Sequence, residues 1–219
     1  MRDLTPLEAR VLGVLVEKQH TVPDTYPLSL NALVAGCNQK TARQPVMDAA
    51  DADVLAALEG LKSLALVNEV SGSRVVRFDH NAARGLGVPG AAVALLAVLM
   101  LRGPQTAAEL RLNSERLHRF ADISSVEGFL EELAEKQPPK VVKLARAPGE
   151  RESRWAHRLC GEVAQPVWPA GAAALPAEAV SAGELSALKA EQARLAAEVA
   201  DLRALVERLA RELGVSATD

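Results

Sequence analysis

Two stretches of the chain predict the same elements in the same order, and this internal repeat limits the possible folds more than any other feature of the sequence. The first stretch opens with Thr5, Pro6 and Glu8, which combine a threonine N-cap with a proline and a carboxylate in the first turn of a helix. Apolar residues at helical spacing then form one stripe, at Ala9, Leu12, Leu15 and Val16. The first element of the repeat is therefore a helix.

Two further helices and a hairpin complete the first copy. Ser29 predicts the start of a second, shorter helix, and a third helix is expected from about Asp51. The β-rich runs 66–70 and 74–78 flank a turn at 71–73 that contains a glycine. The order of the first copy is helix, helix, helix, hairpin.

The second copy follows an expected loop at residues 79–90. Apolar residues between Ala92 and Val98 predict its first helix, and Thr106 with Glu109 predicts the capping box of its second. The third helix has the same apolar spacing in both copies, at Val54, Leu58 and Leu61 and again at Val126, Leu130 and Leu133.

A hairpin also ends the second copy, with strands expected at 141–146 and 152–158. Pro148 and Gly149 suit the central positions of a type II turn, because proline fixes φ and glycine accepts a positive φ. Three helices followed by a hairpin is the element order of a winged helix. We therefore expect a mainly α protein with small β-hairpins, of the α+β class, in which two winged-helix domains stand in tandem.

The domain boundaries follow from this repeat and from two changes in composition after it. The winged-helix domains are expected at 1–85 and 86–163. Residues 164–183 are rich in alanine, proline and glycine without apolar periodicity, which is typical of a linker. Apolar residues recur at heptad spacing in 184–214, which predicts a coiled-coil helix.

The heptad segment predicts a homodimer. Leucine at every d position and valine at two a positions favour a parallel two-stranded coil, in which a buried Gln192 would fix the register. The candidate dimerisation residues are Leu185, Leu188, Gln192, Leu195, Val199, Leu202, Val206 and Leu209. A short helix can also fold back on its own chain, so intramolecular packing is the alternative.

Charge gives no strong sign of a nucleic-acid partner. Residues 1–85 carry nine basic and ten acidic groups, residues 86–165 eleven and ten, and residues 166–219 five and eight, so their net charges are −1, +1 and −3. A strongly basic domain would indicate nucleic acid, and none of these three parts is strongly basic.

Cysteine usage and the apolar runs favour a protein of the cytoplasm. Cys37 and Cys160 have neither metal-ligand nor disulfide-framework spacing. The first residues show no signal-peptide pattern. The longest apolar run, at 91–101, is shorter than the ~20 residues that a membrane-spanning helix needs. We expect a cytoplasmic protein that does not enter a membrane.

Several local sequences form a combination that is highly specific for one protein family. They are Leu7–Gly13, Tyr26–Asn31, Cys37–Thr41 with Pro45–Met47, Leu101–Thr106 and Arg151–His157. In these segments the chain resembles the YceH-like family of uncharacterised bacterial proteins. The resemblance covers residues 1–163 and implies a tandem winged-helix fold with a helical tail. It implies no activity.

Basic residues near the second and third helices and on the hairpins are the candidate DNA contacts. A winged helix can lay its third helix in the major groove while its hairpin reaches phosphate or the minor groove. The candidates are Lys40, Arg43, Arg74 and Arg77 in the first copy and Arg111, Lys143, Arg146, Arg151 and Arg154 in the second, with Arg116, Arg119 and Arg158 beside them. Double-stranded DNA is the expected partner and regulation the expected role, on a surface to which both hairpins contribute.

The third helices favour a different partner, because both are acidic. Asp48, Asp51 and Asp53 lie at the start of the first, and the second carries Glu127, Glu131, Glu132 and Glu135. These charges repel phosphates, and winged helices also serve as docking modules for proteins. A protein–protein scaffold or adaptor is therefore the alternative function.

Catalysis and cofactor binding have little support. Gly85, Gly87 and Gly90 fit GxGxxG, but no parallel βαβ unit surrounds them and Pro89 removes an amide. His157 and Cys160 could form a dyad only if both were exposed and suitably spaced. We expect no enzyme, no cofactor and no metal.

Overall fold

The computed structural model describes residues 2–70 and 75–164, and these belong to one compact unit. The described part is mainly helical with small antiparallel sheets, as expected for the α+β class. The heptad segment 184–214, nearly all of the linker 164–183, and Arg74 lie outside the described residues.

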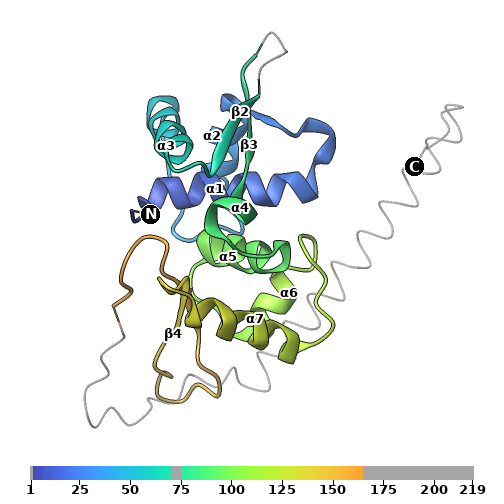
Figure 1. The fold of residues 1–219 in the computed structure, drawn as a ribbon, viewed down its shortest axis with the longest axis vertical. Helices are drawn as coiled ribbons and strands as arrows, with labels where there is room; N and C mark the ends of the chain where they lie inside the picture. Colours follow the sequence, from blue (N-terminus) through green and yellow to red (C-terminus); the bar gives the residue numbers. More distant parts are fainter. Residues whose placement is uncertain (1, 71–74, 165–219) are drawn as a thin grey trace, which may run out of the picture. The chain divides into compact units, whose positions relative to one another are not determined.

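The first copy of the repeat contains three α-helices and a three-stranded sheet (Figure 1). Its elements are α1 (Pro6–Thr21), the 3-10 helix η1 (Pro23–Thr25), β1 (Leu28–Ser29), α2 (Leu30–Cys37), α3 (Asp51–Ser63), β2 (Val67–Val70) and β3 (Arg77–His80). The strands are antiparallel in the order β1-β3-β2. Leu28 opposes Phe78 and Val67 opposes His80, and the apolar members of these pairs turn into the core.

Side-chain caps explain where the helices begin. The Thr5 hydroxyl accepts a hydrogen bond from the amide of Glu8, whose carboxylate in turn accepts one from the Thr5 amide at 2.7 Å. Ser29 caps α2 by accepting from the Ala32 amide. Each cap satisfies an amide that has no partner inside the helix. The predicted starts of both helices are confirmed.

The second copy repeats the order of the first. Its elements are α5 (Gly90–Arg102), α6 (Ala107–Asn113), α7 (Ile123–Glu135), β4 (Val141–Lys143) and β5 (Trp155–His157). Gln105 forms an antiparallel bridge with Trp155, and the next residue, Thr106, caps α6. Gln105 therefore occupies the place in the second copy that β1 occupies before α2 in the first. The capping box of Thr106 and Glu109 is confirmed.

The second hairpin turns as predicted but has shorter strands. Gly149 has a φ of 87°, and the Glu150 amide donates to the Ala147 carbonyl at 3.1 Å, which are the features of a type II turn. Strand pairing covers 141–143 and 155–157, and one further bond joins the Leu144 amide to the Arg154 carbonyl.

The expected loop at 79–90 is wrong in its middle, where α4 (Ala82–Leu86) forms. Gly87 ends this helix with a φ of 65°, a left-handed conformation that glycine adopts at low cost. The GxGxxG pattern therefore lies at the junction between α4 and α5, where its central glycine caps a helix.

Helices α1 and α5 lie side by side in the middle of the described body (Figure 1). Residues 8–16 of α1 and 92–101 of α5 are buried on all sides. The prediction of a single apolar stripe on the first helix is therefore wrong. Gly13 allows the close approach, since a Cβ there would lie 3.0 Å from Leu101 Cγ. The two copies consequently share one hydrophobic core.

Two buried arginines organise the polar segment 38–50 between α2 and α3. Arg10 donates to the carbonyls of Cys37 at 3.0 Å and Pro45 at 2.6 Å, and Arg43 donates through Nε to the Gly36 carbonyl at 3.0 Å. Gly36 and Cys37 end α2, where carbonyls lack partners inside the helix and cations are favoured. Burial, together with the charge of Arg43, lowers the pKa of Arg10. The segment is therefore held by side chains that enter the core.

Candidate functional site

The predicted basic residues of the first copy do not form one patch. Lys40 is exposed. Arg43 is buried, and its guanidinium forms an ion pair with Glu17 at 2.6 Å. A phosphate could reach Arg43 only if this buried pair opened, so the structure does not support its prediction as a DNA contact.

Arg77 is half-buried and faces its own chain. Its guanidinium donates to the carbonyls of Thr25 at 3.1 Å and Pro27 at 2.7 Å. The side chain thus fixes the segment between α1 and α2 against β3. Three of the four candidates of the first copy can be located, and Lys40 alone among these three is exposed.

Two candidates of the second copy are also engaged within the chain. Arg154 forms a forked pair with Glu109, at 2.7 and 3.3 Å, and approaches Glu150 at 3.5 Å. Burial opposes its charge, but the hydrogen bond to Glu109 and the two carboxylates raise the pKa of Arg154 overall. Arg111 is exposed and donates to the Ala121 carbonyl at 3.2 Å.

The remaining three candidates meet in one place. Lys143, Arg146 and Arg151 line a cavity of about 320 Å³ beside the second hairpin, here called the hairpin groove. The Lys143 ammonium lies 5.3 Å from the Trp155 ring centroid, which is cation–π distance. The other residues that line the hairpin groove are Ala107, Glu127, Glu152, Ser153 and Trp155, so the groove carries both signs of charge.

The two hairpins lie at opposite ends of the described body, as the positions of β2–β3 and β4 in Figure 1 show. The expected surface to which both hairpins contribute is therefore wrong. The cause is the packing of α1 against α5, which directs the two sheets away from each other.

The outward faces of both third helices are acidic, as the sequence predicted. In α3, Asp51, Asp53 and Glu59 are exposed beside Leu55, which is 44% exposed. In α7 the exposed acidic residues are Glu127, Glu131, Glu132 and Glu135. A large part of each outer face is thus carboxylate.

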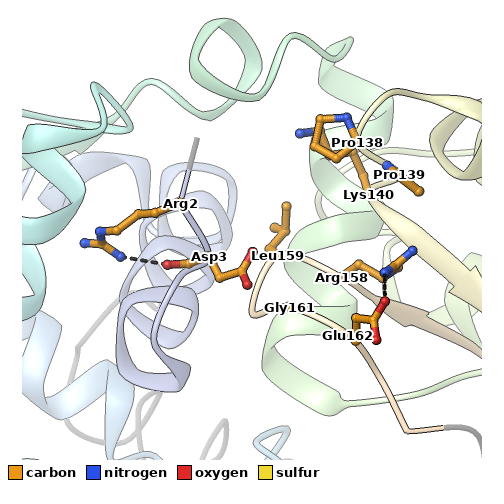
Figure 2. Close-up of a pocket in the computed structure, with 9 residues that line it drawn as sticks. All are labelled: Arg2, Asp3, Pro138, Pro139, Lys140, Arg158, Leu159, Gly161 and Glu162. Atoms are coloured by element: carbon orange, nitrogen blue, oxygen red, sulfur yellow. Dashed lines mark hydrogen bonds and ion pairs between the residues drawn. The ribbon is translucent and has the colours of Figure 1, made fainter.

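A small cavity of about 220 Å³ lies where the N-terminal segment meets the end of the second copy (Figure 2). The Leu4 amide donates to the Leu159 carbonyl at 2.7 Å nearby. Arg158, another basic residue of the hairpin, pairs here with Glu162 at 3.3 Å. Figure 2 shows Arg158 and Glu162 joined at this cavity, and Arg158 is not among the residues that line the hairpin groove.

A third cavity, of about 340 Å³, is lined by segment 38–50 and the second copy and is here called the junction cavity. Its lining comprises Ala42, Arg43, Gln44, Arg102, Pro104, Gln105, Glu109, Asn113 and Arg154. Arg102 and Gln44 were not among the predicted site residues. The available signal was that Arg102 is the one charged residue of α5 and directly follows its apolar run.

The histidine and cysteine near the end of the second copy lack the properties of a catalytic dyad. Burial lowers the pKa of His157 to about 4. Burial, assisted by the charges of Asp3 and Glu8, raises the pKa of Cys160 to about 11. The Cys160 thiol contacts the Thr5 carbonyl at 3.7 Å. A thiol that remains protonated at neutral pH is a poor nucleophile.

Within 2–70 and 75–164, no three histidine, cysteine, aspartate or glutamate side chains gather as a metal site would require. None of the helices in the same residues is both long and apolar enough to cross a membrane.

Comparison with known proteins places the chain in a family. Residues 4–150 match the family described as "Protein of unknown function, DUF480". A UPF0502 protein of Leptothrix cholodnii is 69% identical over 98% of this chain and 97% of its own length. UPF0502 proteins of Burkholderia multivorans and Burkholderia pseudomallei are 69% and 67% identical, over 99% and 98% of this chain and 92% and 91% of theirs. The chain therefore belongs to the DUF480 or UPF0502 family of bacterial proteins, in agreement with the YceH-like resemblance of its local sequences.

Proposed function

We propose that this chain is a non-catalytic adaptor of the bacterial cytoplasm that docks protein partners on two winged-helix units. Both copies have the order helix, short strand or bridge, helix, helix, hairpin, which supports the winged-helix assignment. The described cysteines, Cys37 and Cys160, are both unpaired, which suits a reducing compartment.

The acidic outer faces of α3 and α7 carry this proposal. A winged helix that reads DNA inserts its third helix between two rows of phosphates. Helix α7 contains no lysine, arginine or histidine, and the one lysine of α3, Lys62, is bound by Glu59 at 3.0 Å and Glu69 at 2.7 Å. Neither helix can therefore neutralise phosphates, and both suit a partner surface that carries lysine and arginine.

Reversing charge on α7 tests the adaptor proposal. Glu131→Lys with Glu135→Lys changes two exposed residues one helical turn apart that do not line the hairpin groove. We expect the amount of a stoichiometric partner recovered from a bacterial extract to fall about tenfold, since opposed like charges replace attractive ones. Quantitative mass spectrometry of proteins bound to the tagged full-length chain measures this.

The matched control is Glu115→Lys with Glu162→Lys, which reverses two exposed charges outside both third helices. It should leave recovery unchanged. Equal loss with both double variants, or no loss with either, would contradict docking on α7.

The hairpin groove favours a second candidate, contact with the backbone of double-stranded DNA as part of a regulatory role. Within the described residues, Arg146 and Arg151 are exposed and form no ion pair. Cations that approach phosphates release counterions and gain affinity. Three such residues can hold a duplex without reading its bases, while Glu127 and Glu152 in the same groove oppose it.

Electrophoretic mobility shift over a salt series tests this candidate. If the groove binds DNA, the logarithm of affinity should fall with the logarithm of salt with a slope of about −3, because each phosphate contact contributes about −0.9. The variant Lys143→Gln, Arg146→Gln, Arg151→Gln should lose binding, whereas Arg116→Gln with Arg119→Gln should retain it. Absence of any shift at low salt rules out DNA and leaves the adaptor.

Homodimerisation through the heptad segment is a further part of the proposal, and its support is the sequence pattern alone. Leu195→Glu with Leu202→Glu places charge at two d positions and should halve the mass of the full-length chain in sedimentation equilibrium. Ala197→Glu with Ala204→Glu adds the same charge at outward f positions and should not. An unchanged mass for both would favour the alternative, a helix packed on its own chain.

A further inference from the structure

We propose that the junction cavity binds a small hydroxylated anion, whose anionic group is a phosphate or a carboxylate. The proposal concerns a cavity distinct from the surfaces of the proposed function and does not depend on that function. Its volume of about 340 Å³ falls at the lower end of the ~300–1,000 Å³ typical of small-molecule sites.

The charges of the cavity leave one cation without compensation. Three guanidinium groups and one carboxylate line it. Arg43 is paired with Glu17 and Arg154 with Glu109, so these two are neutralised. Arg102 is half-buried, and its guanidinium forms no hydrogen bond or ion pair within residues 2–70 and 75–164. A half-buried cation is stabilised by an anion, and a guanidinium binds phosphate or carboxylate through two parallel hydrogen bonds.

Gln44 is held beside Arg102 by the backbone. The Gln44 amide donates to the carbonyl of Leu101, the residue before Arg102, at 2.8 Å. A Cβ at Gly103 would lie 3.9 Å from the Gln44 side-chain Cδ, which places that carboxamide close to the turn after α5. Gln44 is exposed and can donate to a second oxygen of an anion bound at Arg102.

Asn113 supplies an acceptor on the other wall. Its side-chain nitrogen donates to Gln105 Oε1 at 2.6 Å, which orients the group, and its Oδ1 accepts no hydrogen bond from the residues that the structure describes. The side-chain nitrogen of Gln105 is bound to the carbonyls of Val98 and Gly103, at 3.5 and 3.4 Å, so the pair is fixed from behind. An amide oxygen accepts from a hydroxyl group and repels an anion. The ligand therefore carries a hydroxyl as well as its charge.

Isothermal titration of the full-length chain with glycerol 3-phosphate, glycerate and glycerol tests the site. We expect saturable binding of at least one of the two anions, and the stronger one identifies phosphate or carboxylate as the preferred group. Arg102→Gln should weaken that binding by about tenfold or more, since it removes a charge-assisted hydrogen bond. Gln44→Ala should weaken it less, and Arg116→Gln, which removes an exposed arginine outside the cavity, should not change it.

The melting temperatures of the variants without ligand show that each is folded. Failure of both anions to saturate, equal binding of uncharged glycerol, or equal affinity of wild type and Arg102→Gln would each overturn the proposal. None of these outcomes bears on the adaptor, because Arg102 lies on neither third helix nor the hairpin groove.

Discussion

The packing of α1 against α5 is the contact on which the rest of the structure depends. The first helix of each copy buries nine or ten consecutive residues, and either copy alone would leave the side that faces the other copy open to water, which is costly for apolar side chains. Placing the two faces together buries both and joins the copies around one core. The close approach at Gly13 requires the absence of a side chain there. This contact also decides where the hairpins and third helices point.

The resulting structure divides the predicted basic residues into two groups: Lys143, Arg146 and Arg151 share the hairpin groove, while several others bind groups of their own chain. Three of the arginines predicted to bind DNA hold pieces of the fold instead: Arg43 anchors segment 38–50, Arg77 the turn after α1, and Arg154 the second hairpin. The carboxylates of α3 and α7, in contrast, point outward. Third helices with acidic outer faces are better suited to bind a basic protein surface than a phosphate backbone. The junction cavity is a separate feature, since residues of both copies line it around Arg102.

Local signals predicted the elements well because caps, turns and apolar spacing act over a few residues. Thr5, Thr106 and Pro148-Gly149 do what their sequences indicate. The candidate site was less predictable, since a sequence does not show which arginine a distant Glu17 or Glu109 will bind. Arg10 has the sequence signature of a surface residue on a helix, yet it is buried, because its partners are carbonyls 27 and 35 positions away. The repeat predicted two units but not their common core.

Native-state hydrogen exchange in increasing urea tests that common core most directly. The amides of Leu58 in α3 and Leu130 in α7 report on the two copies, and both residues are fully buried. If α1 and α5 form one core, both amides should lose protection with the same dependence on urea. Gly13→Leu should then lower the free energy of opening by the same amount at both amides. Loss of protection in one copy while the other stays closed would contradict the account, because the copies would then be independent domains.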